Sequence, residues 1–357
     1  METKLKKIVQ KLTQSGADAL VLHAPQNRRY LTGLRTSAGA VVVTARADAV
    51  FAVDFRYITA ARQALRASPM DCQEVDAGAE DLWIAAYLRE RGCRRVLVED
   101  QFLTMARFKQ LEELWPAELA GCGWMEELRS VKTPQELQNI RTSQEIAEQS
   151  LRETLEHAAP GMTERQVEAY LTWRLLENGS ENGVFGIVAA SGPNSALPHA
   201  VPTDRKLQRG DFLLIDFGAL YQGWYSDITR TVAIGCAGEE MRTVYRLVQD
   251  ACEAAIAAVS GGVNAAAADE AARSVIRQAG YGDFFGHGLG HGVGLDIHEL
   301  PRLRPGSQDV LRPGNVVTVE PGVYLPERFG VRIEDLLAVT EAGCSRLTQM
   351  TRELIVL

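Results

Sequence analysis

The feature that most constrains the fold is a pair of apolar segments, residues 212–218 and 224–234, joined by a short turn. Each segment carries one aspartate where an apolar residue would be expected, Asp216 in the first and Asp227 in the second. Paired residues of an antiparallel hairpin have a constant sum of positions, so a turn centred on residues 221–222 places the two aspartates opposite each other. Their Cβ atoms would then be roughly 5 Å apart.

Two carboxylates that face each other inside a sheet repel and lose solvation unless a positive group lies between them. A metal ion is the simplest group that fits. The alternative is that one aspartate caps a turn while the other pairs with Arg230 at the surface. An isolated pair does not distinguish these interpretations, so the rest of the chain has to decide.

The length, composition and net charge of the chain argue against several classes of protein. A chain of 357 residues, 46% of them hydrophobic, predicts an ordinary globular protein with two domains. The net charge of −8, without a basic run, argues against a nucleic-acid or membrane partner. Six scattered cysteines, an N-terminus unlike a signal peptide and no apolar run of about 18–20 residues predict a cytoplasmic location.

Residues 1–127 alternate helical and strand-like segments, which predicts a small α/β domain. A boundary follows where Thr133 can cap a helix, and residues 128–357 form the second predicted domain. In that domain two helix starts, at Thr163 and Asn264, follow similar glycine-containing segments and lead to strands with acidic residues. We therefore expect a weak internal duplication. In the first domain the predicted strands are 19–24, 38–45, 49–54 and 94–100, and the predicted helices are 1–16, 56–65 and 81–92.

Glycine alternates with other residues in the segment FFGHGLGHGVGLDIHELP, residues 284–301. Because every second position has no side chain, another backbone segment or a ligand can approach this segment closely. His287 and His291 lie between these glycines, where they are poor core residues. The alternative is a flexible glycine-rich loop with incidental histidines. His298 and Glu299 are predicted to end the next strand.

The last predicted sheet repeats the arrangement of the aspartates. One strand carries Glu320 near its end, and the returning strand carries Glu334 near its start. A loop centred on Glu327 would make the two glutamates cross-strand neighbours. With the two aspartates and His291, the chain offers four carboxylates and one imidazole. Their charge balances that of two divalent cations ~3.5–4 Å apart.

These residues and their surroundings resemble the dinuclear metallopeptidases of the pita-bread fold, which include methionine aminopeptidase, Xaa-Pro aminopeptidase and Xaa-Pro dipeptidase (prolidase). RRYLTG and DFRYITAA resemble the creatinase-type domain of the proline-specific branch. The resemblance covers essentially the whole chain. It implies an α/β (α+β) architecture, in which a creatinase-like N-terminal domain precedes a catalytic domain with a curved antiparallel sheet covered by helices. The other motifs that carry it are SDITRT, GHGLGHGVGL, HELP, VEPGVYLP and GVRIED.

By this resemblance the chain would bind two divalent metal ions. Asp216 would bind one ion, and His291 with Glu320 would bind the other. Asp227 and Glu334 would bridge them. Mn²⁺ is the first expectation because the ligands are mainly carboxylates, and the histidine also admits Co²⁺, Zn²⁺ or Fe²⁺.

The resemblance also implies roles for residues outside this ligand set. His199 matches the substrate-binding histidine, and His298 matches the histidine that steadies the scissile carbonyl and its tetrahedral intermediate. His287 and Arg332 match positions that orient the ligands. The chain departs from the family pattern, with consequences for fine specificity only, at Ala200, Val184 and Leu336.

The implied reaction is hydrolysis of an N-terminal Xaa-Pro bond by a metal-bridging hydroxide, with Glu320 relaying a proton to the leaving nitrogen. The first expectation is an Xaa-Pro aminopeptidase that also accepts dipeptides, and the alternative is a strict Xaa-Pro dipeptidase. Arg302 or Arg304 could hold a dipeptide's carboxylate, or could simply be solvated. A non-catalytic binding protein and a creatinase-like C–N hydrolase fit less well because all five ligands are present. The family further implies a homodimer that acts on short peptides with proline at position 2.

Overall fold

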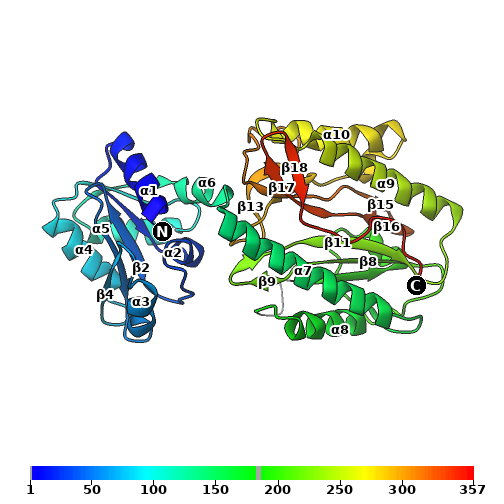
Figure 1. Cartoon of the computed structure of the whole chain (residues 1–357), viewed down its shortest axis with the longest axis horizontal. Coiled ribbons are helices and arrows are strands. Elements are labelled where there is room, and N and C mark those ends of the chain that lie inside the picture. Colours follow the sequence, from blue (N-terminus) through cyan, green and yellow to red (C-terminus); the bar gives the residue numbers. More distant parts are fainter. Residues whose placement is uncertain (1, 182–185) are drawn as a thin grey trace. The chain divides into compact units, whose positions relative to one another are not determined.

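The computed structural model describes residues 2–181 and 186–357, so Val184 lies outside the described residues. The chain divides into two compact units, Met1–Arg129 and Ser130–Leu357 (Figure 1). The predicted boundary after residue 127 lies two residues before this division. None of the helices in the described ranges is long and apolar enough to cross a membrane.

The N-terminal unit is a mixed α/β structure built on one six-stranded sheet. Its elements are α1 Glu2–Ser15, β1 Ala19–Leu22, α2 Pro25–Thr32, β2 Ala40–Thr44, β3 Ala49–Val53, α3 Ile58–Ala64, β4 Asp71–Glu74, α4 Glu80–Glu90, β5 Arg95–Glu99, α5 Met105–Leu114, β6 Glu118–Cys122 and α6 Trp124–Ser130. The strand order is β4-β3-β2-β1-β5-β6. Every residue of β1, β2 and β3 is buried, as expected for strands covered on both faces.

The predicted strands correspond to β1, β2, β3 and β5, and the predicted helices to α1, α3 and α4. The sequence analysis missed α2, β4, α5, β6 and α6. The two missed strands lie at the edges of the sheet and are only partly buried. An edge strand needs no continuous apolar run, so β4, with the sequence DCQE, carries no strand pattern that could be recognised.

The C-terminal unit contains two helix-covered antiparallel sheets. Its helices and strands are α7 Pro134–His157, α8 Glu164–Glu177, β7 Val188–Ser191, β8 Phe212–Phe217, β9 Leu220–Tyr221, β10 Trp224–Tyr225, β11 Ile228–Ala233, α9 Glu239–Ala258, α10 Ala265–Gln278, β12 Gly290–Gly292, β13 Glu299–Leu303, β14 Val316–Val319, β15 Gly322–Leu325, β16 Phe329–Arg332, β17 Asp335–Thr340 and β18 Gly343–Arg346. Among the described residues, two 3₁₀ turns, Gly192–Ala196 and Gly282–Phe284, complete the set. One of these sheets has the order β11-β8-β7, and the other has the order β13-β12-β14-β17-β18. The described residues also form two two-stranded sheets, β10-β9 and β15-β16.

Each of the two larger sheets of this unit packs on its own pair of helices (Figure 1). Buried side chains of α7 and α8 form one core with β8 and β11. Those of α9 and α10 form a second core with β14 and β17. The strands that carry the predicted site residues therefore lie between two layers of helices.

The two halves of this unit repeat one local geometry at the start of α8 and of α10. Gly161 and Gly262 have φ values of +92° and +86°, which favour glycine. Their amides donate to the carbonyl oxygens of Leu207 (2.9 Å) and Leu311 (2.8 Å), respectively. The side chains of Thr163 and Asn264 then cap the two helices. This correspondence is what the predicted internal duplication requires.

Candidate metal centre

Asp216 and Asp227 come from the central hairpin, but their predicted register was wrong. The turn consists of Gln222 and Gly223, whose φ values of 47° and 79° suit a two-residue hairpin. It lies one residue later than expected, so pairing shifts by two and Asp216 faces Thr229 instead of Asp227. Side chains alternate with a period of two along a strand, so this shift leaves both aspartates on the same face.

Glu320 and Glu334 lie opposite each other, as predicted. Val319 pairs with Asp335 at the end of the β14–β17 ladder, and the β15–β16 ladder continues the same register. The loop that closes β15–β16 contains Glu327, which has a φ of 62°. The glutamates occupy the gap between the two ladders, where the paired strands pass from one sheet to the other.

The alternate glycines allow β12 to approach its neighbours closely. A Cβ on Gly290 would lie 2.2 Å from the carbonyl oxygen of Thr318, and one on Gly292 would lie 2.1 Å from that of Leu300. No side chain fits at either position. His291 between them is thereby held between β13 and β14, and β14 leads directly to Glu320.

His298 precedes β13, so the prediction that it ends a strand was wrong. The chain turns back between β12 and β13 instead of continuing as a strand, and this turn brings the two histidines together. The rings of His291 and His298 make an edge-to-face contact, with centroids 4.3 Å apart.

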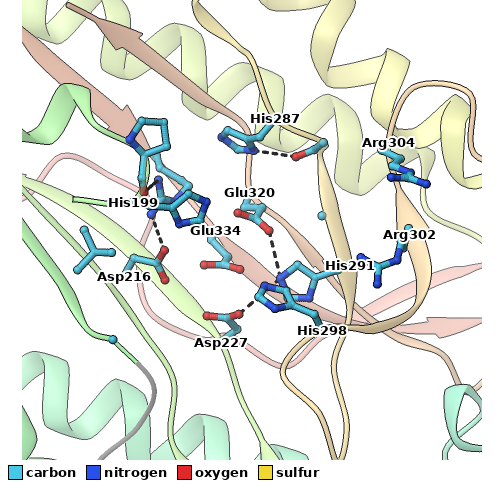
Figure 2. A pocket seen from close by; sticks show the side chains of 16 residues that line it. His199, Asp216, Asp227, His287, His291, His298, Arg302, Arg304, Glu320 and Glu334 are labelled. Carbon is cyan, nitrogen blue, oxygen red and sulfur yellow. Dashed lines mark hydrogen bonds and ion pairs between the residues drawn. The ribbon is translucent and has the colours of Figure 1, made fainter. Parts of the chain in front are cut away.

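All nine predicted site residues line one cavity of about 300 Å³ (Figure 2). The labelled carboxylates of the two aspartates and two glutamates converge on its floor, with the two histidines of the β12–β13 region beside them (Figure 2). The nine residues are His199, Asp216, Asp227, His287, His291, His298, Glu320, Arg332 and Glu334.

The four carboxylates at the floor of the cavity share two positive partners among the described residues, Arg332 beside Asp216 and His291 beside Glu320 and Asp227. Ligand atoms of Asp227, His291 and Glu334 lie within 4.8 Å of one another. Asp227 Oδ1 is buried and has no hydrogen-bond partner among the described residues. Burial, reinforced by the neighbouring carboxylates, raises the pKa of Asp227 and of Glu334 well above the ordinary value. This arrangement is costly for a protein alone and fits a bound cation.

His291 presents Nε2 to the carboxylates. Its Nδ1 lies 3.1 Å from the carbonyl oxygen of Gly292 and can only donate there. Nε2 lies 3.3 Å from Glu320 Oε1 and 3.7 Å from Asp227 Oδ2. Burial is the largest single influence and favours the neutral imidazole, but the hydrogen bond to Glu320 and the charges of Glu320 and Asp227 together raise the pKa of His291 to about 9. In the metal-free protein, the His291 imidazolium therefore balances part of the negative charge of the carboxylates.

A chain of hydrogen bonds connects Asp216 to His287. Arg332 Nη2 donates to Asp216 Oδ2, and Arg332 Nη1 donates to the hydroxyl of Tyr324 (2.7 Å). His287 Nδ1 donates to the carbonyl oxygen of Gly288 (2.8 Å), so Nε2 accepts from the Tyr324 hydroxyl (2.8 Å). Burial lowers the pKa of His287, which favours this neutral form. The sequence analysis gave Tyr324 no role, although it lies within the VEPGVYLP motif.

Replacing Tyr324 with phenylalanine should break this chain without changing the cavity's shape. We expect about a 10–100-fold fall in activity or metal affinity, the usual cost of losing a residue that orients a ligand. Steady-state kinetics and metal titration of the variant test this. Tyr221→Phe, on a β9 residue outside the cavity, is the control. Equal behaviour of the two variants would contradict the role of Tyr324.

The loop that carries His199 is held by a second residue that the sequence analysis missed. Glu164 is fully buried and accepts hydrogen bonds at both ends of the loop. At the two ends its partners are the backbone N–H (2.7 Å) and hydroxyl (2.7 Å) of Ser191 and the backbone N–H (3.0 Å) and hydroxyl (2.6 Å) of Thr203, and within the loop Asn194 Nδ2 also donates to it (3.1 Å). A first-turn glutamate after Thr163 looks like ordinary helix capping in sequence, so nothing marked it as special.

Known proteins match both units of the chain. The profile of Metallopeptidase family M24 matches residues 138–341, and that of the Creatinase/Prolidase N-terminal domain matches residues 4–131. The Xaa-Pro dipeptidase of Pyrococcus furiosus is 34% identical over 99% of this chain and 100% of its own length.

Two solved structures have the same architecture over both units. The Xaa-Pro dipeptidase from Bacillus anthracis has a TM-score of 0.95 at 34% identity and covers 100% of this chain and 99% of its own. The X-Pro aminopeptidase from Thermotoga maritima MSB8 has a TM-score of 0.90 at 31% identity and covers 99% of each chain.

Proposed function

The chain belongs to metallopeptidase family M24, and we propose that within this family it is an Xaa-Pro dipeptidase with two divalent metal ions. Its units are the creatinase-type and pita-bread domains of a metallo-exopeptidase. The comparisons favour the dipeptidase over the aminopeptidase that was expected first, because several of the similar proteins are Xaa-Pro dipeptidases or prolidases. The homodimer that the resemblance implies is part of the same proposal.

The dipeptide preference rests on the position of Arg302 at the edge of the cavity and on its guanidinium, which is unpaired among the described residues. Its side chain is exposed, lines the cavity and lies on the side of His298 (Figure 2). Its backbone N–H donates to Asp309 Oδ2 (2.8 Å), but its guanidinium forms no ion pair within the described part of the chain. Its charge helps to lower the pKa of His298, which places it within electrostatic reach of that ring. A dipeptide ends in a carboxylate immediately after proline, and an unpaired guanidinium is the natural partner for that group.

The five predicted ligands would hold the metal ions, with Asp216 on one ion, His291 and Glu320 on the other, and Asp227 and Glu334 between them. Their four carboxylates balance two divalent charges, and Mn²⁺ suits such an oxygen-rich set. When bound, the ions polarise the scissile carbonyl and lower the pKa of water to near neutrality. Asp227 Oδ1, which has no partner in the described structure, would gain one.

The remaining steps belong to side chains of the cavity. Burial, followed by the charge of His291, lowers the pKa of His298, so its ring is neutral at neutral pH and can donate one N–H to the substrate carbonyl. Burial alone would raise the pKa of Glu320, but the hydrogen bond with His291 and the neighbouring positive charges together lower it to about 2 in the metal-free protein. Glu320 is therefore ionised and can accept a proton and deliver it to the departing prolyl nitrogen. His199 would contact the substrate on the opposite side of the cavity (Figure 2).

Hydrolysis of Ala-Pro by chelated and metal-restored protein tests this function. We expect free alanine and proline from the protein supplied with Mn²⁺, and no product from the chelated protein. Co²⁺ and Zn²⁺ are tested in parallel. Failure to cleave Ala-Pro with any of these ions would contradict the proposal.

Replacing Arg302 with methionine should weaken dipeptide binding specifically. A hydrogen-bonded ion pair is worth enough that we expect kcat/KM for Ala-Pro to fall about 10–100-fold, mainly through KM. Ala-Pro amide, which lacks the carboxylate, should be little affected. Arg304→Met is the matched control, because Arg304 is also exposed and also lines the cavity. An equal loss on the dipeptide and on its amide would exclude carboxylate recognition by Arg302.

A further inference from the structure

We propose that Lys132 is a positioning residue for His298 and acts through Glu299. This inference rests on the proposed function, in which His298 donates to the substrate carbonyl. Lys132 Nζ lies 2.5 Å from Glu299 Oε1, and the two side chains are 0% and 1% exposed. Glu299 directly follows His298, so the ion pair fixes the backbone next to the catalytic histidine.

Lys132 is itself held firmly at the start of the catalytic unit. Its Nζ also donates to the carbonyl oxygen of Ser130 (3.2 Å), and its backbone N–H donates to that of Gly314 (2.8 Å). Asn315 Nδ2 donates to the same Ser130 oxygen (2.9 Å). A buried ammonium is stable only when it is paired and hydrogen-bonded, and these contacts meet that requirement. The charged end of Lys132 therefore has a defined position relative to the start of β14.

The other side of the Glu299 carboxylate is bounded by Gly294. A Cβ on Gly294 would lie 2.3 Å from Glu299 Oε1 and 2.6 Å from Cδ. The carboxylate thus fills the space that a side chain at position 294 would take. This explains the last of the alternating glycines, which the metal site does not require. Glu299 is confined between the ammonium of Lys132 and the backbone of Gly294.

His298 depends on this anchor because its ring has little else to hold it. Among the residues that the structure describes, the ring has no hydrogen-bond partner, and its aromatic contact is the edge-to-face one with His291. The ring direction is then set by the backbone at residues 298 and 299. A displacement of about 1 Å in a catalytic group can lower the rate by a factor of 10². Releasing Glu299 should therefore act on catalysis through His298.

Two substitutions release Glu299 from opposite sides. Lys132→Met removes the ammonium but keeps the length of the side chain, and Gly294→Ala displaces the carboxylate while leaving the ammonium in place. In full-length, Mn²⁺-restored protein we expect both to lower kcat for Ala-Pro about 10–100-fold, with little change in KM or metal content. Leu171→Ala, in the core beneath β8, is the control for general destabilisation. It should lower the melting temperature without lowering kcat at temperatures where the protein is folded.

A second readout does not depend on activity. The chain has six histidines, so the ring signals of ¹³C-labelled histidine can be resolved by NMR, and the His298 signal is the one lost in His298→Gln. That signal should shift in Lys132→Met and in Gly294→Ala and stay in place in Leu171→Ala. An unchanged His298 signal with unchanged kcat in Lys132→Met would overturn the inference. If the wild-type protein does not cleave Ala-Pro, the proposed function fails while the NMR comparison still decides the positioning role.

Discussion

Replacing Asp227 with asparagine should abolish hydrolysis of Ala-Pro and at the same time stabilise the metal-free protein at neutral pH. Activity should fall at least about 10³-fold, since loss of a single charge-stabilising group in an active site already costs 10²–10³. The stability gain arises because asparagine neither repels Asp216 nor requires a counter-charge in the buried cavity. Each kcal/mol gained should raise the melting temperature by about 2–4 °C.

The pH dependence of this gain has a defined sign. The fold raises the pKa of Asp227, so the folded protein holds this proton to higher pH than the unfolded chain does. The stability that protonated Asp227 contributes is complete below the pKa of this group in the unfolded chain. It is lost as pH rises through the pKa in the folded protein. Chelated wild-type protein should therefore lose stability from mildly acidic to neutral pH, and Asp227→Asn should lose less.

Thermal unfolding of the chelated proteins across this pH range measures the effect. Asp204→Asn is the matched control, because the side chain of Asp204 is 80% exposed and its ion pair with Arg165 lies at the surface. It should change neither activity nor stability appreciably. A metal-free Asp227→Asn protein that is less stable than wild type at pH 7 would show that the Asp227 carboxylate does not destabilise the fold in the absence of metal.

The second large effect is a proton-linked affinity for metal. His291 has a pKa of about 9, so it is protonated between pH 6 and 8, whereas a metal ligand must be neutral. Releasing one proton makes affinity rise about tenfold for each pH unit, or about 100-fold over this range. The raised pKa of Asp227 and of Glu334 acts in the same direction. In the metal-free protein, the contribution of His291 to stability is full below pH about 6.5 and is lost as pH rises through about 9.

Calorimetry of Mn²⁺ binding in two buffers with different ionisation enthalpies counts the released protons. We expect at least one proton per binding event at pH 7. His157→Gln is the control, because His157 stacks on Tyr170 and is not part of the cavity lining. Affinity that is independent of pH between 6 and 8 would mean that His291 does not take up the proton that the metal displaces.

The convergence of the four carboxylates and His291 on one cavity could be predicted from the sequence because polar side chains interrupt strands that are otherwise apolar. Even the wrong register at Asp216 and Asp227 preserved the site, since the error of two residues kept both side chains on one face. For Glu320 and Glu334 the loop position predicted the register itself. A turn displaced by one residue changes the strand pairing by two residues and keeps each side chain on its face. A change of one residue in the pairing would have moved the side chains to the opposite face.

The supporting residues could not be predicted, because their roles depend on contacts between distant segments. Lys132 and Glu299 are 167 residues apart, and neither lies in a local pattern that requires the other. Tyr324 looks like a core strand residue until Arg332 and His287 are placed on either side of its hydroxyl. Glu164 resembles a helix-capping residue in sequence. The sequence therefore indicated which charged side chains line the cavity, but not which other residues keep these side chains in position.

The central claim, a metal-dependent dipeptidase, is tested most directly by comparing kcat/KM for Ala-Pro and Ala-Pro-Ala with the same Mn²⁺-restored wild-type protein. Both substrates contain the same scissile bond, and only the dipeptide places a carboxylate next to the proline ring. We predict a clear preference for Ala-Pro that chelation abolishes. Equal or faster release of alanine from Ala-Pro-Ala would contradict the dipeptidase assignment and restore the aminopeptidase.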